Sequence, residues 1–217
     1  MLAGILFTTC LLIANILAVK IIMIGPWAAP AGIMIFPVAY ILNDVIAEVW
    51  GYKKARLIIW SGFTMNLLMV LFFSLAIILP PAAFWTGQSG FAQTVGSTPR
   101  IVFASIMAYL TGSFLNALIM SRMKIRHKGK NFGVRAIVST FAGETADSFI
   151  FISVAFAGLF PVRALIIMVV TQALLKTLYE IIVLPLTGRV VAWVKKTENQ
   201  DVFDYSVSYN PFKIIEI

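Results

Sequence analysis

The sequence is poor in charge and almost lacks cysteine and histidine. Only 12% of its 217 residues are charged, with 17 Lys and Arg against 9 Asp and Glu, and it holds one cysteine, Cys10, and one histidine, His127. A lone cysteine excludes a disulfide within the chain, and one cysteine with one histidine does not make the usual metal-binding spacings. We therefore expect no metal site and no cofactor.

Motifs of catalysis are also missing. The sequence has no Walker A motif, no Ser/His/Asp arrangement and no zinc pattern. Enzymes in the common hydrolase, nucleotidase and metalloenzyme classes are disfavoured, and we expect no catalytic residues. The sequence predicts a protein that is not an enzyme.

Apolar residues dominate what is present. They make up 60% of the chain, against roughly 45–50% in soluble domains, and the mean hydropathy is +0.95. About 20 apolar residues cross a bilayer as one helix. The sequence predicts an all-α membrane protein of six transmembrane helices over residues 1–196, with a cytoplasmic tail at 197–217. The expected spans are 2–19, 33–49, 57–79, 101–121, 136–160 and 164–192. The first has no cleavage signal and is expected to be retained.

The loop cations indicate the orientation. They gather at 50–56, at 121–135 and after residue 188, which six helices bring to one side of the membrane, whereas the other side has only Lys20, Arg100 and Arg163. Cytoplasmic loops carry such an excess. We expect both termini in the cytoplasm, and a net charge of +8 that does not indicate nucleic-acid binding.

Two segments outside the spans have two readings each. The loop 80–99 is either an interfacial aromatic loop or a lid over the outer mouth. The tail after Thr197 is either disordered or docked against the cytoplasmic face.

Most of the few acids lie inside apolar stretches. A charge at the bilayer centre costs about 2.5 to 17 kcal/mol depending on method, so such residues face a bundle interior or a wet cavity and mark a site. Helical spacing places them in stripes on the second, fifth and sixth spans, and amides on other spans join them. The candidate substrate-binding residues are Asn15, Tyr40, Asn43, Asp44, Glu48, Asn116, Glu144, Asp147, Gln172, Lys176 and Glu180.

The roles of these charges remain open between structure and binding. An ion pair of Lys176 with Glu180 or Asp147 is a structural reading, whereas Asp44 and Glu144 favour ligand binding or proton carriage. Arg56 and Arg135 could also reach in from the inner interface. A carboxylate accepts two parallel N–H bonds, as from a guanine-type edge, and aromatic faces stack such a ring. Other amine- or amide-bearing metabolites would fit too.

The order of several motifs resembles the queuosine precursor transporters, a vitamin-uptake-transporter-like group of membrane proteins. The signature is the run from Phe36 to Asp44, then Glu48 to Tyr52, then Ala55-Arg56. Agreeing pieces are Asn15 with Lys20, Arg100 with Ala104-Ser105, Ser139-Thr140 with Gly143-Glu144 and Asp147, Lys176 with Tyr179-Glu180 and Pro185, and Asn210-Pro211-Phe212.

The resemblance implies six transmembrane helices, similar in fold to the substrate-binding subunits of energy-coupling-factor transporters. It implies import of a deazapurine base, 7-cyano-7-deazaguanine or its 7-aminomethyl form, across the plasma membrane, which is the inner membrane of a Gram-negative cell. The expected partners are this small molecule and the lipid bilayer, with a homodimer left open.

Two other functions compete with a stand-alone transporter. Ala14-xxx-Ala18 allows close approach of another helix, either within the chain or as the capture subunit of an ATP-driven uptake complex. A structural membrane-assembly protein is the third reading. The surplus of buried acids predicts proton coupling, and the opposed halves would allow an inverted repeat, although no sequence self-similarity supports one.

Overall fold

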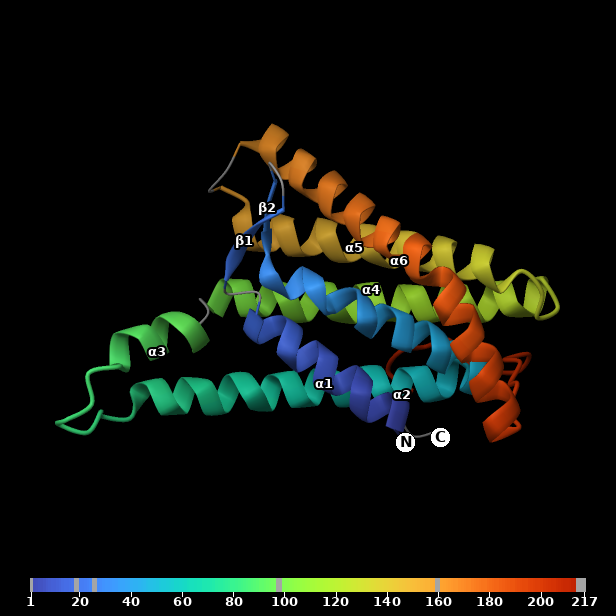
Figure 1. The fold of residues 1–217 in the computed structure, drawn as a ribbon, viewed down its shortest axis with the longest axis horizontal. Helices are drawn as coiled ribbons and strands as arrows, with labels where there is room; N and C mark the ends of the chain where they lie inside the picture. The colour runs from blue at the N-terminus through green and yellow to red at the C-terminus, as the bar shows by residue number, and fades with distance from the viewer. Residues whose placement is uncertain (1, 18–19, 25–26, 97–98, 159–160, 214–217) are drawn as a thin grey trace.

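A bundle of long helices forms the body of the protein (Figure 1). The computed structural model describes residues 2–17, 20–24, 27–96, 99–158 and 161–213. The elements in chain order are α1 (Leu2–Leu17), β1 (Ile21–Ile24), β2 (Trp27–Pro30), the 3₁₀ turn η1 (Ala31–Met34), α2 (Phe36–Ile78), α3 (Gln88–Val95), α4 (Pro99–Arg126), α5 (Phe132–Phe156) and α6 (Val162–Glu198).

Helix α2 consists of two arms joined at Gly51. Gly51 has φ 80° and ψ 175°, a backbone conformation that is essentially restricted to glycine. In Figure 1 the first arm, in blue, runs toward one end of the bundle, and the second, in teal, returns from it. The two spans predicted at 33–49 and 57–79 therefore correspond to the arms 36–50 and 52–78.

Four of the described helices are long and apolar enough to cross a membrane. They are α2, α4, α5 and α6, whereas α1 is apolar but has 16 residues. Large apolar side chains such as Leu71, Phe72 and Ile78 are exposed on the outside of the second arm of α2. A helix with an apolar outer surface suits lipid, where its backbone bonds are satisfied internally. The prediction of a helical, multi-pass membrane protein is confirmed at this level.

A short hairpin departs from the all-α prediction. Strands β1 and β2 pair antiparallel, with Ile21 opposite Pro30 and Ile24 opposite Trp27. The strand Ile21–Ile24 is rich in β-branched isoleucine, which favours extended backbone, and the sequence Gly25-Pro26 follows it. The prediction missed this hairpin because its apolar run is short and lacks a polar alternation.

The segments divide between the two ends of the bundle as the charge pattern predicts. The Gly51 turn, the α4–α5 connection, the end of α6 and residues 199–213 lie at one end, while the hairpin, α3 and the start of α6 lie at the other (Figure 1). Helix α6 contains Pro185, which removes a backbone hydrogen bond and kinks a helix. The second half of α6 crosses the end of the bundle that holds the Gly51 turn (Figure 1).

The structure does not test whether the loop 80–99 acts as a lid. The described residues of 80–96 form α3 and a turn that stand away from the bundle (Figure 1), and the Phe84 side chain is exposed. Gln88 Nε2 donates a hydrogen bond of 2.9 Å to Ile77 O. This contact ties α3 to the end of α2.

Candidate functional site

Asp44 lies at the centre of the bundle and is completely buried. Asn116 Nδ2 on α4 donates to Asp44 Oδ1 at 2.7 Å, and Thr140 Oγ1 on α5 donates to Oδ2 at 3.4 Å. The carboxylate therefore joins α2, α4 and α5. Both of its oxygens accept from neutral donors, and none of the ion pairs among the described residues involves it.

A second buried group joins α5 to α6. Lys176 Nζ lies 2.6 Å from Glu144 Oε2 and 2.9 Å from Asp147 Oδ2. The predicted ion pair of Lys176 with Asp147 is confirmed. The second acid that pairs with Lys176 is Glu144, whereas the sequence indicated Glu180 as the alternative. The ammonium sits between two carboxylates on one face of α5, one turn apart.

We call Asp44, Asn116, Glu144, Asp147, Lys176 and Glu180 the polar centre. Its four carboxylates are buried and face one lysine within the group. The acids of α2 and α5 approach as predicted: Lys176 on α6 bridges two acids of α5, and Thr140, on the same face of α5, binds Asp44. From α6 the observed contact is made by Lys176, whereas the acid Glu180 is buried nearby on the same face of its helix.

Several acceptors in and beside the polar centre lack a donor. Among the described residues, no hydrogen bond reaches Glu144 Oε1, Glu180 Oε1, Asn116 Oδ1 or Asn43 Oδ1, although all four are buried. The Asn43 amide nitrogen donates to Ser113 O at 3.2 Å. A buried acceptor without a partner costs about 1–3 kcal/mol, so a ligand rich in N–H donors would relieve this cost.

Two glycines let the helices approach closely beside these groups. A Cβ on Gly112 would lie 2.4 Å from the Tyr40 hydroxyl and 2.9 Å from Gly143 O, and a Cβ on Gly143 would lie 3.1 Å from Asn116 Cβ. Glycine has no side chain, so α4 and α5 can touch. The Tyr40 ring is thereby held against this contact, within the group predicted from the sequence.

Glu48 belongs to a different network at the cationic end. Its carboxylate accepts from both terminal nitrogens of Arg135, the second at 3.0 Å, and from Lys195 Nζ at 2.6 Å. Arg135 is completely buried. The predicted inward reach of Arg135 is thus observed, whereas Arg56 binds the C-terminal tail instead.

The same network takes in the tail. Lys124 and Lys195 both contact Asp201, with Lys195 Nζ at 2.9 Å from Oδ1. Partial burial raises the pKa of Asp201, but the hydrogen bonds from Lys124 and Lys195 outweigh burial and leave the pKa below its usual value. The sequence offered no signal for this network beyond the basic residues themselves.

The other predicted residues lie apart. Asn15 on α1 donates to Asn66 on the second arm of α2, and Ser105 Oγ donates to Asn15 Oδ1 at 3.3 Å. Gln172 is half-buried on α6, one turn before Lys176. Asn15 therefore belongs to a separate polar cluster.

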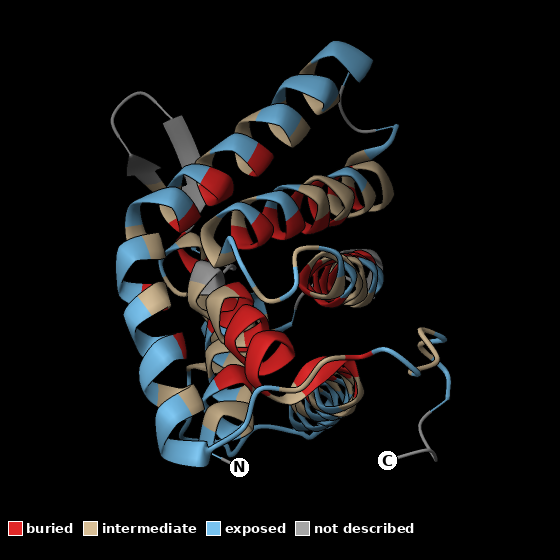
Figure 2. Cartoon of the chain, turned by 90° about the vertical axis from the view of Figure 1, so that its right-hand side faces the viewer, coloured by how far each residue is buried: buried red, intermediate tan, exposed pale blue. Residues whose placement is uncertain are grey.

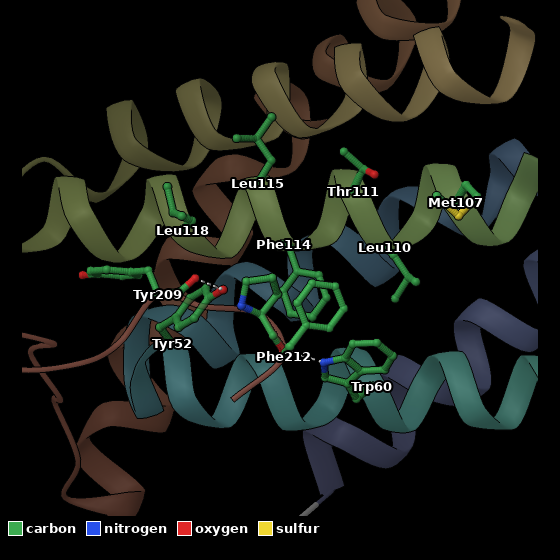
Figure 3. Close-up of a pocket in the computed structure, with 11 residues that line it drawn as sticks. Tyr52, Trp60, Met107, Leu110, Thr111, Phe114, Leu115, Leu118, Tyr209 and Phe212 are labelled. Carbon is green, nitrogen blue, oxygen red and sulfur yellow. Dashed lines mark hydrogen bonds between the residues drawn. The ribbon is translucent and has the colours of Figure 1, made fainter. Parts of the chain in front are cut away.

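Two of the hollows that described residues line have no acidic residue in their lining. One, of about 380 Å³, lies between the second arm of α2 and α4, where Trp60 and Phe114 meet Tyr209 and Phe212 of the tail (Figure 3). The other, of about 550 Å³, lies between Leu17, Lys20 and α3. The acids of the polar centre are instead packed against their partners.

The fold and these buried charges define a class: a helical, multi-pass membrane protein with an ionisable interior. The family described as "Putative vitamin uptake transporter" matches residues 30–190, and the chain belongs to this family. The predicted family resemblance is confirmed.

Two curated relatives carry the same name. A "Probable queuosine precursor transporter" of Bacillus subtilis is 25% identical over 173 residues, which covers 79% of this chain and 76% of that protein. One of Haemophilus influenzae is 26% identical over 125 residues, covering 58% of this chain and 51% of that protein. No solved structure matches the chain significantly.

Proposed function

We propose that this protein is a transporter that imports a queuosine precursor, a deazapurine base such as 7-cyano-7-deazaguanine or its 7-aminomethyl form. The observation that carries the proposal is the set of buried acceptors without donors in and beside the polar centre. The names of both relatives agree with this substrate class.

The chemistry of the polar centre suits a guanine-type edge. Such an edge presents N–H and NH₂ donors side by side, and a carboxylate accepts two parallel N–H bonds. Glu144 and Glu180 each keep a buried oxygen for a donor, and Asn116 adds an amide oxygen. The Tyr40 ring supplies an aromatic face beside Asn116.

Proton coupling belongs to the same proposal. The polar centre holds four carboxylates and one lysine, so a proton or a cationic partner must balance the remaining charge in a low-dielectric interior. Coupled import would bring that proton with the base. Uptake that is indifferent to pH and to uncouplers would contradict this part.

We further propose six membrane spans: α1, both arms of α2, α4, α5 and α6. In this arrangement residues 1–196 form the transmembrane domain, and the cationic end faces the cytoplasm of the plasma membrane, the inner membrane in a Gram-negative cell. Similarity to the binding subunits of energy-coupling-factor transporters and a homodimer remain part of this proposal.

The alternative of an ATP-driven capture subunit has less support. Its motivation was the small-residue pair Ala14-xxx-Ala18, but Ala14 is buried within this chain's own bundle, and Ala18 lies outside the described residues. Uptake by the purified chain alone in liposomes would favour a stand-alone transporter, whereas a requirement for an ATPase would favour the alternative.

Uptake of labelled 7-cyano-7-deazaguanine tests the function directly. In cells that cannot make the base, the protein should restore uptake, and Asp44→Asn or Glu144→Gln should lower it by about tenfold or more, since each changes a buried hydrogen-bonding charge. Glu198→Gln, an exposed acid at the end of α6, is the matched control. Normal uptake by both centre variants would refute the site.

A further inference from the structure

The C-terminal tail lies across the cationic end of the bundle (Figure 2). Its first part is fixed at the Gly51 turn of α2: Val202 N donates to Val49 O at 3.1 Å, and Tyr52 N donates to Asp204 Oδ2 at 2.9 Å. Ser121 on α4 donates to the same Asp204 oxygen. The buried Asp204 carboxylate therefore links the tail to two helices.

The second part of the tail is fixed to the second arm of α2. Arg56 Nη1 donates to Ser208 O at 3.1 Å and to Asn210 O at 2.8 Å, and Trp60 Nε1 donates to Pro211 O at 2.8 Å. Tyr52 donates to Tyr209 O at 3.1 Å (Figure 3). These bonds make the tail a docked strap, which agrees with the docked reading of the sequence.

Beneath the strap lies the network around Glu48. Glu48 is one helical turn beyond Asp44 on α2, and Arg135 is about one turn before Ser139 and Thr140 on α5. Glu48 joins α2 to Arg135 of α5 and Lys195 of α6, and Lys195 and Lys124 continue to Asp201 of the tail. The network therefore stands between the polar centre and this end of the bundle.

We infer that residues 199–213, together with the Glu48 network, form a gate that closes the polar centre at the cationic end. This inference rests on the proposed transport function, because a cargo leaving by this end must pass these contacts. The strap crosses the turn of α2 and binds α4, so parting those helices breaks its bonds. Hydrogen bonds hold the described residues of the strap to α2 and α4, so the strap can lift from them without unfolding the bundle.

A buried cysteine reports whether the gate is closed. Ser139 is completely buried on α5, and Ser139→Cys in a Cys10→Ala background places a small thiol behind the network. In inside-out vesicles, a membrane-impermeant maleimide should label this thiol slowly. Asp204→Ala should accelerate labelling by about tenfold or more, because it removes the acceptor of two buried bonds.

Controls separate opening of the gate from loss of the fold. Ser206→Ala changes an exposed tail residue and should leave the rate unchanged, and the melting temperature of each variant in detergent checks folding. Should Asp204→Ala not fold, Trp60→Phe removes the bond to Pro211 while keeping an aromatic ring against Phe212, and it should still accelerate labelling. Equal rates in a folded variant with a weakened strap and in the parent would overturn the gate.

Crosslinking asks whether the strap must move. In the Cys10→Ala background without the reporter, Ser121→Cys with Asp204→Cys places two thiols where the serine and the carboxylate now bond. Oxidation should abolish uptake, and reduction should restore it. Undiminished uptake in the oxidised protein would show that the strap need not move during transport, and it would refute the gate. Labelling needs no substrate, so its outcome is independent of whether the deazapurine assignment holds.

Discussion

At the scale of single residues, Glu48 and Arg135 show how a buried charge is retained. Both side chains are almost completely excluded from solvent, and two parallel bonds join them. Removing one partner of such a pair leaves the other charge buried without compensation, which costs about 3–5 kcal/mol. The pair holds α2 to α5, so its contribution is to the fold more than to binding.

Glu48→Gln and Arg135→Gln should therefore each lower the free energy of unfolding by about 3 kcal/mol. The double variant should lose less than the sum of the two single losses, because the residues act as a pair. Denaturant titration in micelles measures these values. Glu198→Gln should stay within about 0.5 kcal/mol of the parent. Strictly additive losses would show that the two residues do not act as a pair.

The ion pairs of Asp201 make the stability of the docked tail depend on pH in a predictable direction. Its pKa is depressed by Lys124 and Lys195, with Glu48 the acid that shares both cations. A carboxyl with a depressed folded pKa stabilises the fold above its unfolded pKa, about 3.9, and loses this contribution as the pH falls through the folded value.

In purified protein, labelling of the Ser139→Cys reporter should therefore rise as the pH falls below about 4. The energy involved is small, about 0–1 kcal/mol, since Asp201 is 47% exposed and solvent screens its pairs. Maleimide needs the thiolate and is too slow at this pH, so a pyridyl disulfide such as 4,4′-dithiodipyridine, which reacts with thiols in acid, serves as the probe, and each rate is divided by that of a free thiol at the same pH. An Asp201→Asn variant should lack the acid dependence, and an unchanged dependence in that variant would assign it to other carboxyls.

At the scale of elements, the sequence predicted the order of helices but not every bend. Apolar runs of about 20 residues placed the spans, because lipid-facing helices need them. The chain is helical on both sides of Gly51 and reverses direction at this residue. The sequence predicted a gap between two spans here, but not the sharp turn that joins the two arms. The hairpin β1–β2 was missed, since four-residue apolar runs do not separate strand from helix.

The close packing of α4 against α5 can be tested by substituting a glycine at their contact. Gly112→Ala would place a Cβ 2.9 Å from Gly143 O and against Tyr40, and overpacking of this kind costs about 1–3 kcal/mol. Gly188→Ala on α6 meets no atom within 4 Å and should stabilise by about 0.5–1 kcal/mol through helix propensity. Melting temperatures in detergent compare the two; equal shifts would contradict the close packing.

At the scale of the whole molecule, the candidate site was predictable in part. Helical spacing predicted inward faces for Asp44, Glu144, Asp147 and Lys176. The structure joins Lys176 to both acids of α5 and binds Asp44 to Thr140 of the same helix. The sequence grouped Glu48 with the binding residues, whereas the structure pairs it with Arg135 and Lys195. These partners come from distant segments whose approach depends on tertiary packing. Asn15 was placed with the acids on residue type alone, yet it pairs with Asn66.

The central claim is that the polar centre binds a base rich in N–H donors. The most direct measurement is the melting temperature of detergent-purified protein against a panel of purine and deazapurine bases, because a ligand that binds the folded state stabilises it by mass action. We expect 7-cyano-7-deazaguanine to raise the melting temperature of the parent and of Glu198→Gln, but not that of Asp44→Asn or Glu144→Gln. No shift with any base, or equal shifts in all four proteins, would contradict it.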